Sequence, residues 1–198
     1  MLVFSKANLV FLSVPKTGTT SYQAALGRYA DMVITDPPGL KHAALYRYNR
    51  FIRPMYEKVC KLDLEVMAVM REPVSWLGSW YRYRQRPALK GHANSTAGMS
   101  FNAFVLAHLQ DEPPSFANVG RQSRFLEDRT NGAVVQHLFA YENQERIQAF
   151  LGKRLNVTFS LDRLNVSPEL QTELSPGVLA QLRRKHSEDF ALYDRITR

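Results

Sequence analysis

Cysteine is nearly absent from this sequence of 198 residues, since Cys60 is the only one. A single cysteine cannot form a disulfide within the chain, which excludes a disulfide-stapled secreted fold and favours a reducing compartment. Long apolar runs are missing as well, and none approaches the ~20 residues of a membrane-spanning helix. Residues 1–16 have no small-residue cleavage site, and Lys6 and Asn8 interrupt their apolar runs, so they predict a first strand and not a signal peptide. We therefore expect a cytoplasmic protein without a membrane span.

Internal repeats, low-complexity tracts and linkers are also missing. The length fits one domain, residues 1–198. Apolar residues make up 45% and charged residues 22% of the chain, which is typical of a globular protein that buries its own core.

Positive charge is in excess, with a formal net charge of +8. Such an excess favours an anionic ligand, and nucleic acid, a membrane surface, a nucleotide or an acidic glycan would each qualify. A basic surface without a specific ligand would give the same charge, so the positions of the cations must decide. The five histidines and one cysteine show no metal-ligand spacing, and we predict no metal site.

Strand and helix patterns alternate along the chain. Strands are predicted at residues 8–14, 64–70 and 133–141. Helices are predicted from residue 21, over 41–56 as far as Pro54, from Pro73, and over 100–109, 144–155 and 175–195. Ser100 is the predicted cap of the helix over 100–109. Residues 86–98 and 161–168 predict loops. The alternation predicts an α/β fold, a three-layer sandwich with a central parallel sheet between helices.

The loop at residues 13–20, SVPKTGTT, lies between a buried strand and a helix. Free backbone N–H groups at such a junction bind anions, and the positive end of the helix dipole adds to the attraction. Gly18 permits close approach of a ligand, Lys16 adds a cation, and the threonines add hydroxyls. The nucleotide-triphosphate pattern G-x-x-x-x-G-K-[ST] is not matched, because Ser13 and Thr19 stand where its first glycine and its lysine belong.

A second group of polar residues follows the second predicted strand. Arg71 stands where that strand ends, which is the usual ligand edge of a parallel sheet. A guanidinium binds phosphate through two hydrogen bonds. Ser79, about two turns into the next helix, can donate a hydroxyl to the same anion.

Together these two segments resemble the sulfotransferases that use 3′-phosphoadenosine 5′-phosphosulfate, in particular bacterial and carbohydrate sulfotransferases. PKTGTT at 15–20 is similar to the family's 5′-phosphosulfate loop. REPVSWLGSWY at 71–81 is similar to its 3′-phosphate segment, in which an R-x-P and a serine eight residues after the arginine are followed by an aromatic residue. LNVSP at 164–168 and SEDFALY at 187–193 are weaker matches near the C-terminus.

The resemblance implies a nucleotide-triphosphatase-like sulfotransferase fold, with 3′-phosphoadenosine 5′-phosphosulfate as donor and adenosine 3′,5′-bisphosphate as product. It assigns cofactor binding to the loop and to the second segment, and makes Lys16 catalytic because the loop lysine aids departure of the nucleotide. The residues expected to bind the cofactor are Pro15, Lys16, Thr17, Gly18, Thr19, Thr20, Arg71 and Ser79.

The acceptor is a hydroxyl or an amine, and a base must take its proton. Family members use a histidine or a glutamate, and His42 is our first candidate, ahead of His92, Glu72 and Asp36. The cations near His42 favour a carbohydrate or another polyhydroxylated or acidic acceptor. The loop at 86–98 is a candidate acceptor lid, and the residues before it, from Tyr81 to Arg86, are candidate contacts.

Two alternatives remain open. One is an atypical nucleotide-dependent kinase, which the order of lysine and glycine in the loop opposes. The other is a basic nucleic-acid-binding domain, although no helix-turn-helix, zinc-finger or RNP pattern occurs and we expect no nucleic-acid partner. The oligomeric state cannot be read from the sequence.

Overall fold

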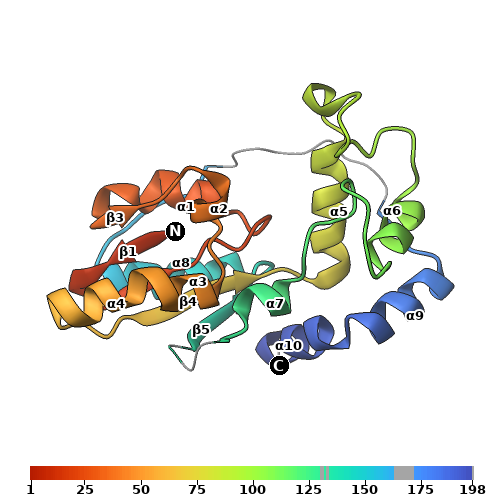
Figure 1. Ribbon diagram of the computed structural model, residues 1–198. Helices are drawn as coiled ribbons and strands as arrows, with labels where there is room; N and C mark the ends of the chain where they lie inside the picture. Colours follow the sequence, from red (N-terminus) through yellow and green to blue (C-terminus); the bar gives the residue numbers. More distant parts are fainter. Residues whose placement is uncertain (130–131, 133, 163–171, 198) are drawn as a thin grey trace. The chain divides into compact units, whose positions relative to one another are not determined.

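The computed structural model describes residues 1–129, 132, 134–162 and 172–197. These residues divide into two units (Figure 1). The first comprises the described residues of Met1–Arg71 and Gln122–Leu164, and the second those of Glu72–Arg121 and Asn165–Arg198. That both units belong to one domain stays a prediction. The segment 164–168, which resembles a family motif, lies outside the described residues.

The first unit is built on a five-stranded sheet with the order β3-β1-β2-β4-β5. β2 pairs in parallel with β4, and β4 pairs in parallel with β5. The predicted strands at 8–14, 64–70 and 133–141 are thus confirmed as β2, β4 and β5. The strands are β1 Leu2–Phe4, β2 Leu9–Phe11, β3 Met32–Val33, β4 Glu65–Met70 and β5 Val135–Ala140.

The N-terminal side of the sheet is antiparallel, so the prediction of a parallel sheet is wrong there. β1 pairs antiparallel with both β2 and β3. The connection from β1 to β2 is a 3₁₀ turn, Ser5–Ala7, followed by Asn8 at φ 50°. So short a connection can join only antiparallel neighbours. Lys6 and Asn8, which interrupt the apolar pattern, therefore belong to the connection between two strands.

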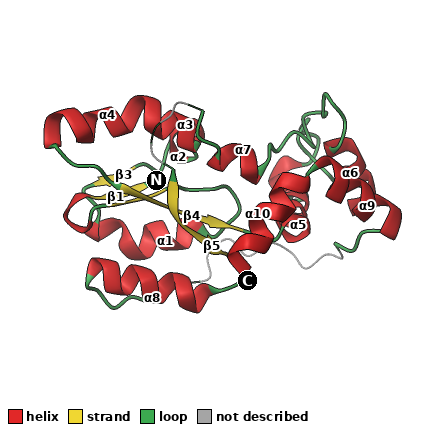
Figure 2. Ribbon diagram, turned by 90° about the horizontal axis from the view of Figure 1, so that it is seen from below, coloured by secondary structure: helices red, strands yellow, loops and turns green. Residues whose placement is uncertain are grey.

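Helices cover both faces of this sheet (Figure 2), as the predicted three-layer arrangement requires. On one face, α1 and α8 pack through Tyr22, Leu26, Ile147 and Leu151 against alternate residues of the strands. The other face carries the helical residues 45–60, from which Tyr48 and Tyr56 are buried. The helices of this unit are α1 Thr19–Leu26, α2 Pro38–Lys41, α3 Leu45–Arg47, α4 Arg53–Met55, α7 Gln122–Leu126 and α8 Gln144–Leu155.

Helix 45–60 differs from its prediction at both ends. It begins at Leu45 and continues past Pro54 to Cys60. α3 and α4 alternate in it with π-helical turns at Tyr48–Ile52 and Tyr56–Cys60. A proline removes one hydrogen bond of a regular α-helix and crowds the preceding turn, and the wider π turns on either side relieve that conflict.

The second unit is helical. α5 begins at Pro73 as predicted, and the Glu72 carboxylate caps it by accepting from the Ser75 N–H at 2.6 Å. Ser100 caps α6 by accepting from the Ala103 N–H at 3.2 Å, which confirms the predicted cap. A core that includes Trp76 and Phe104 joins the helices. They are α5 Pro73–Arg84, α6 Phe101–His108, α9 Pro176–Lys185 and α10 Ser187–Thr197.

The single C-terminal helix predicted over 175–195 is two helices, and His186 separates α9 from α10. Val178, Leu182 and Phe190 are buried at spacings that a continuous helix would also give, so the pattern conceals the break. Contacts of the second unit hold the bend: the His186 ring lies 4.9 Å from the ring of His108. Across the described residues, every helix falls short of the length and apolar character that a membrane crossing requires.

Glu65 joins several segments at the amino end of the parallel strands. Its Oε2 accepts from His137 Nε2 at 2.5 Å and from Arg154 at 2.9 Å. Arg154 also donates to the carbonyl oxygens of Ala7 and Asn8. The hydrogen bonds from His137 and then Arg154 lower the pKa of Glu65 below the usual value for a glutamate.

We predict that Glu65→Gln lowers the free energy of unfolding by about 1 kcal/mol at neutral pH, because these partners are partly exposed and water screens them. A lowered carboxyl pKa stabilises the fold above the ordinary glutamate pKa, and this contribution disappears as the pH falls through the lowered value. The difference between variant and parent should therefore close in acid. Urea unfolding across pH measures it, with Glu112→Gln on an exposed loop as control. Equal losses at neutral and acidic pH would contradict the assignment.

Candidate functional site

The site forms at one edge of the first unit's sheet. Because β2, β4 and β5 run in parallel, their carboxyl ends meet at that edge. The segments that leave it are the loop at 13–20, Arg71 and Tyr141. Two of the three were predicted to bind an anion, and the topology brings them to neighbouring strands.

The loop is shaped by two left-handed residues, Lys16 at φ 66° and Gly18 at φ 74°. A non-glycine residue in this region is strained, so the loop imposes that conformation on Lys16. Gly18 is the N-cap of α1, and no side chain within the described part of the chain caps that helix. The first N–H groups of α1 have no preceding turn of helix to donate to, which is the arrangement that suits a bound anion.

The three threonines of the loop differ in their surroundings. Thr17 is fully buried, and its hydroxyl donates to the Val14 carbonyl at 2.9 Å. That hydroxyl stabilises the loop itself, and the backbone N–H is what Thr17 can offer a ligand. Thr19 is buried, whereas Thr20 is exposed and its hydroxyl accepts from Lys41 Nζ at 3.4 Å.

His42 lies in a turn directly after α2 and contacts the start of the same loop. Its Nδ1 is 2.7 Å from the Ser13 carbonyl oxygen. A carbonyl oxygen only accepts, so Nδ1 carries the proton and Nε2 is the basic nitrogen of the neutral ring. Gln23 fixes Ser13 from the other side, donating to its hydroxyl at 3.4 Å. The structure thus brings His42 and Lys41 to the two ends of the anion loop.

The environment of His42 favours its neutral form. Burial lowers the pKa of His42, and the positive charges of Lys41, the terminal amino group and Lys16 act in the same direction. The hydrogen bond to Ser13 opposes them without reversing the shift. A neutral imidazole with a defined tautomer beside a cationic loop is suited to accept a proton.

The side chain of Gln122 fixes the backbone of Arg71. Gln122 accepts from the Arg71 N–H at 2.9 Å and donates to the Arg71 carbonyl at 2.7 Å. The guanidinium lies over the ring of Tyr141, 4.7 Å from its centre. Tyr141 extends the pairing of β4 and β5, since its N–H donates to the Met70 carbonyl at 2.7 Å.

Tyr141 links the two predicted anion sites. A Cβ added to Gly18 would lie 3.1 Å from Tyr141 Cε2, so the loop and this ring are in close approach. A side chain at position 18 would be both strained and crowded. Sequence reasoning missed Tyr141 and Gln122. Tyr141 ends a predicted strand and could have been found by the rule that selected Arg71, but nothing in the sequence marks Gln122.

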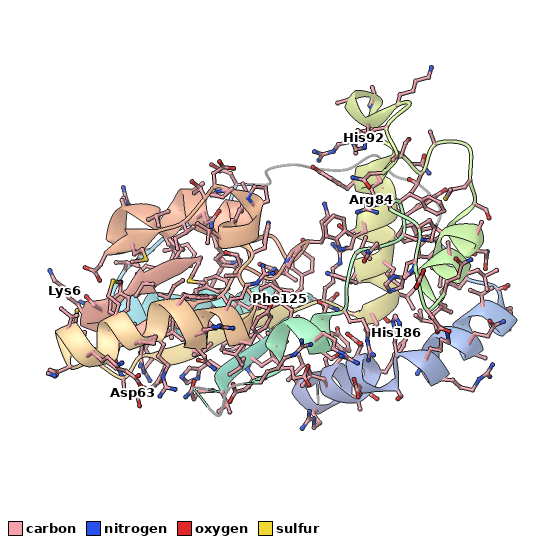
Figure 3. The ribbon with its side chains drawn as sticks, viewed as in Figure 1. Lys6, Asp63, Arg84, His92, Phe125 and His186 are labelled. Atoms are coloured by element: carbon pink, nitrogen blue, oxygen red, sulfur yellow. The ribbon has the colours of Figure 1, made fainter. Side chains whose placement is uncertain are left out.

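Ser79 belongs to the second unit, where it is buried in α5. The weaker candidates for the base have other surroundings: Glu72 caps α5, Asp36 is exposed, and His92 is exposed and accepts from the Asn94 N–H at 3.1 Å (Figure 3). His108 Nδ1 donates to the Ala117 carbonyl at 2.9 Å in the second unit's core.

The predicted lid at 86–98 is an irregular loop with one 3₁₀ turn, Pro87–Leu89. Thr96 anchors it to α5 by donating to the Tyr81 carbonyl at 2.9 Å. Tyr81 and Arg84 are buried, and they donate to the carbonyls of Met99 and Ser115. These two side chains hold loops of the second unit in place.

Among the described residues, no group of three or more His, Cys, Asp or Glu side chains could hold a metal ion.

Comparison of the chain with family models, with curated proteins and with solved structures finds no match. Function must therefore be argued from the site.

We predict that His42 titrates below the ~6.5 of an ordinary histidine and that its neutral ring carries the proton on Nδ1. Lys41→Ala removes a positive neighbour, so it should raise the pKa of His42. Nitrogen-15 NMR titration of the ring measures both the pKa and the tautomer. Lys153→Ala, on the exposed surface of α8, is the matched control and should leave His42 unchanged. A His42 pKa at or above the ordinary value would refute this description.

Proposed function

We propose that this chain is a sulfotransferase that moves a sulfuryl group from 3′-phosphoadenosine 5′-phosphosulfate to a hydroxyl or amine of an acceptor. One observation carries the proposal. The start of α1, which no side chain in the described part of the chain caps, follows β2 together with the strained Lys16. Arg71 follows the neighbouring parallel strand, β4, and Tyr141 approaches both segments. This spacing of two cationic anion sites suits a nucleotide with phosphate groups at both ends of its ribose.

The residues present fit such a donor. The backbone N–H groups of 17–20 and the ammonium of Lys16 would hold the 5′-phosphosulfate. The Arg71 guanidinium, oriented by Gln122 and Tyr141, would hold the 3′-phosphate. Ser79 remains a predicted second ligand of that phosphate, and Pro15 shapes the entry to the loop.

The donor supplies the sulfuryl group, and the chain supplies positive charge and a base. Lys16 stabilises the charge that develops on the phosphate oxygen as the nucleotide leaves. His42 accepts the proton of the attacking acceptor at Nε2, because its Nδ1 proton is held by Ser13. No metal is required by this scheme.

The cations near His42 favour a carbohydrate or another polyhydroxylated acceptor, as the sequence also predicts. Lys41 and Arg47 supply this charge, and the Arg47 guanidinium lies 5.5 Å from the centre of the Tyr46 ring, an aromatic surface of the kind that sugars pack on. We further propose a cytoplasmic location, where the single exposed cysteine, Cys60, stays reduced.

We predict that adenosine 3′,5′-bisphosphate binds roughly 10- to 100-fold more tightly than adenosine 5′-monophosphate, because a charge-assisted phosphate contact contributes about 1.5–3 kcal/mol. Arg71→Ala should abolish this preference, whereas Arg28→Ala, which removes an exposed cation elsewhere in the unit, should keep it. Isothermal titration calorimetry provides the measurement. Equal affinity for the two nucleotides would remove the donor assignment, and tighter binding of ATP than of the bisphosphate would favour the kinase alternative.

We predict that Lys16→Ala and His42→Gln lower turnover far more than they weaken bisphosphate binding. Loss of the lysine should cost about 10²–10³ in kcat if it acts only in the transition state. Lys16→Gly, which fits φ 66° without strain, should be equally slow and so exclude a folding effect. Only His42→Gln should remove the acidic limb of the rate profile. An acceptor screen with labelled donor gives the assay, and a Lys16→Ala enzyme with normal turnover would refute the mechanism.

A further inference from the structure

Helix 45–60 exposes a row of apolar side chains. Phe51, Met55 and Val59 are 67%, 42% and 76% exposed, although the same helix buries Tyr48 and Tyr56. They follow one another at intervals of four residues. Figure 2 shows the helix on the outside of the sheet, on the face opposite α1 and α8.

The irregular helix geometry explains why these residues form a straight row. An α-helix has 3.6 residues in each turn, so a spacing of four drifts around its surface. The π-helical turns Tyr48–Ile52 and Tyr56–Cys60 are wider and bring the average close to four. Tyr48 and Tyr56, which are eight residues apart in the same helix, are buried.

The charges around this row are mostly positive. Its exposed neighbours include four cations, and the only acidic residue within 45–61, Glu57, pairs with Arg53 at 2.7 Å. Asp63, just beyond the helix, lies 3.4 Å from the same arginine (Figure 3). The exposed cations are Arg47, Arg50, Lys58 and Lys61.

We propose that this face of helix 45–60 docks on an anionic lipid surface, with Phe51, Met55 and Val59 inserted at the level of the headgroups. Amphipathic helices that combine apolar residues with arginine and lysine bind membrane interfaces in this way. A second copy of the chain fits the face less well, because it would bring like charges together. Nucleic acid would satisfy the cations but would leave Met55 and Val59 without an apolar partner. The proposal does not rest on the sulfotransferase assignment.

The test is co-sedimentation of the whole chain with vesicles. Vesicles of phosphatidylcholine mixed with phosphatidylglycerol should bind it, and pure phosphatidylcholine should not. Phe51→Ser with Val59→Ser should weaken binding about tenfold or more, because two apolar side chains no longer leave water. Arg50→Gln with Lys58→Gln should weaken it about 25-fold, at about fivefold for each cation near the surface. Leu106→Ser, at an exposed apolar residue of α6, is the control and should bind like the parent.

Circular dichroism checks that each variant is folded. Three results would overturn the proposal: no preference for anionic vesicles, parental binding by the double serine variant, or a change of oligomeric state in that variant without lipid, which would assign the face to a second copy. Binding to duplex DNA that both variant pairs weaken equally would assign it to nucleic acid instead.

Discussion

The parallel pairing of β2 with β4 and of β4 with β5 is the constraint on which the candidate site depends. Each of these strands ends in a segment with a different chemical character: an anion loop, an arginine and a tyrosine. The pairing fixes the order of the three, and direct contacts then tie them together. The Arg71 guanidinium lies over the Tyr141 ring, and that ring lies against Gly18. Side chains separated by more than 120 positions in the sequence thereby form one cationic surface.

His42 depends on the same frame through a single hydrogen bond to the Ser13 carbonyl. Burial and neighbouring cations favour its neutral form, and the carbonyl decides which nitrogen of that form carries the proton. These effects act on one ring from separate sources. Charge comes from Lys41 and Lys16, whereas orientation comes from the backbone at the end of β2.

Cations of the first unit lie on two kinds of surface. Some cations lie at the ends of strands, beside backbone N–H groups that can share an anion. Others line an outer helix next to exposed apolar side chains, on a face with no unpaired acid within residues 45–61. The amino-acid composition gives only the total number of these cations and not their positions. We propose that the two surfaces bind different anions, a compact phosphate group in one case and an extended lipid surface in the other.

The sequence alone determined the elements whose signals are local. The parallel strands, the start of α5 at Pro73 and the cap of α6 each follow from residues near one another in the chain, because apolar periodicity, proline and capping act over a few positions. The tertiary structure decided what depends on distant partners. Packing between distant residues, which short-range patterns do not predict, produces three features. They are the N-terminal hairpin, the break at His186 and the continuation of a helix past Pro54. The roles of Gln122 and Tyr141 have the same origin, since only the pairing of strands brings them to Arg71.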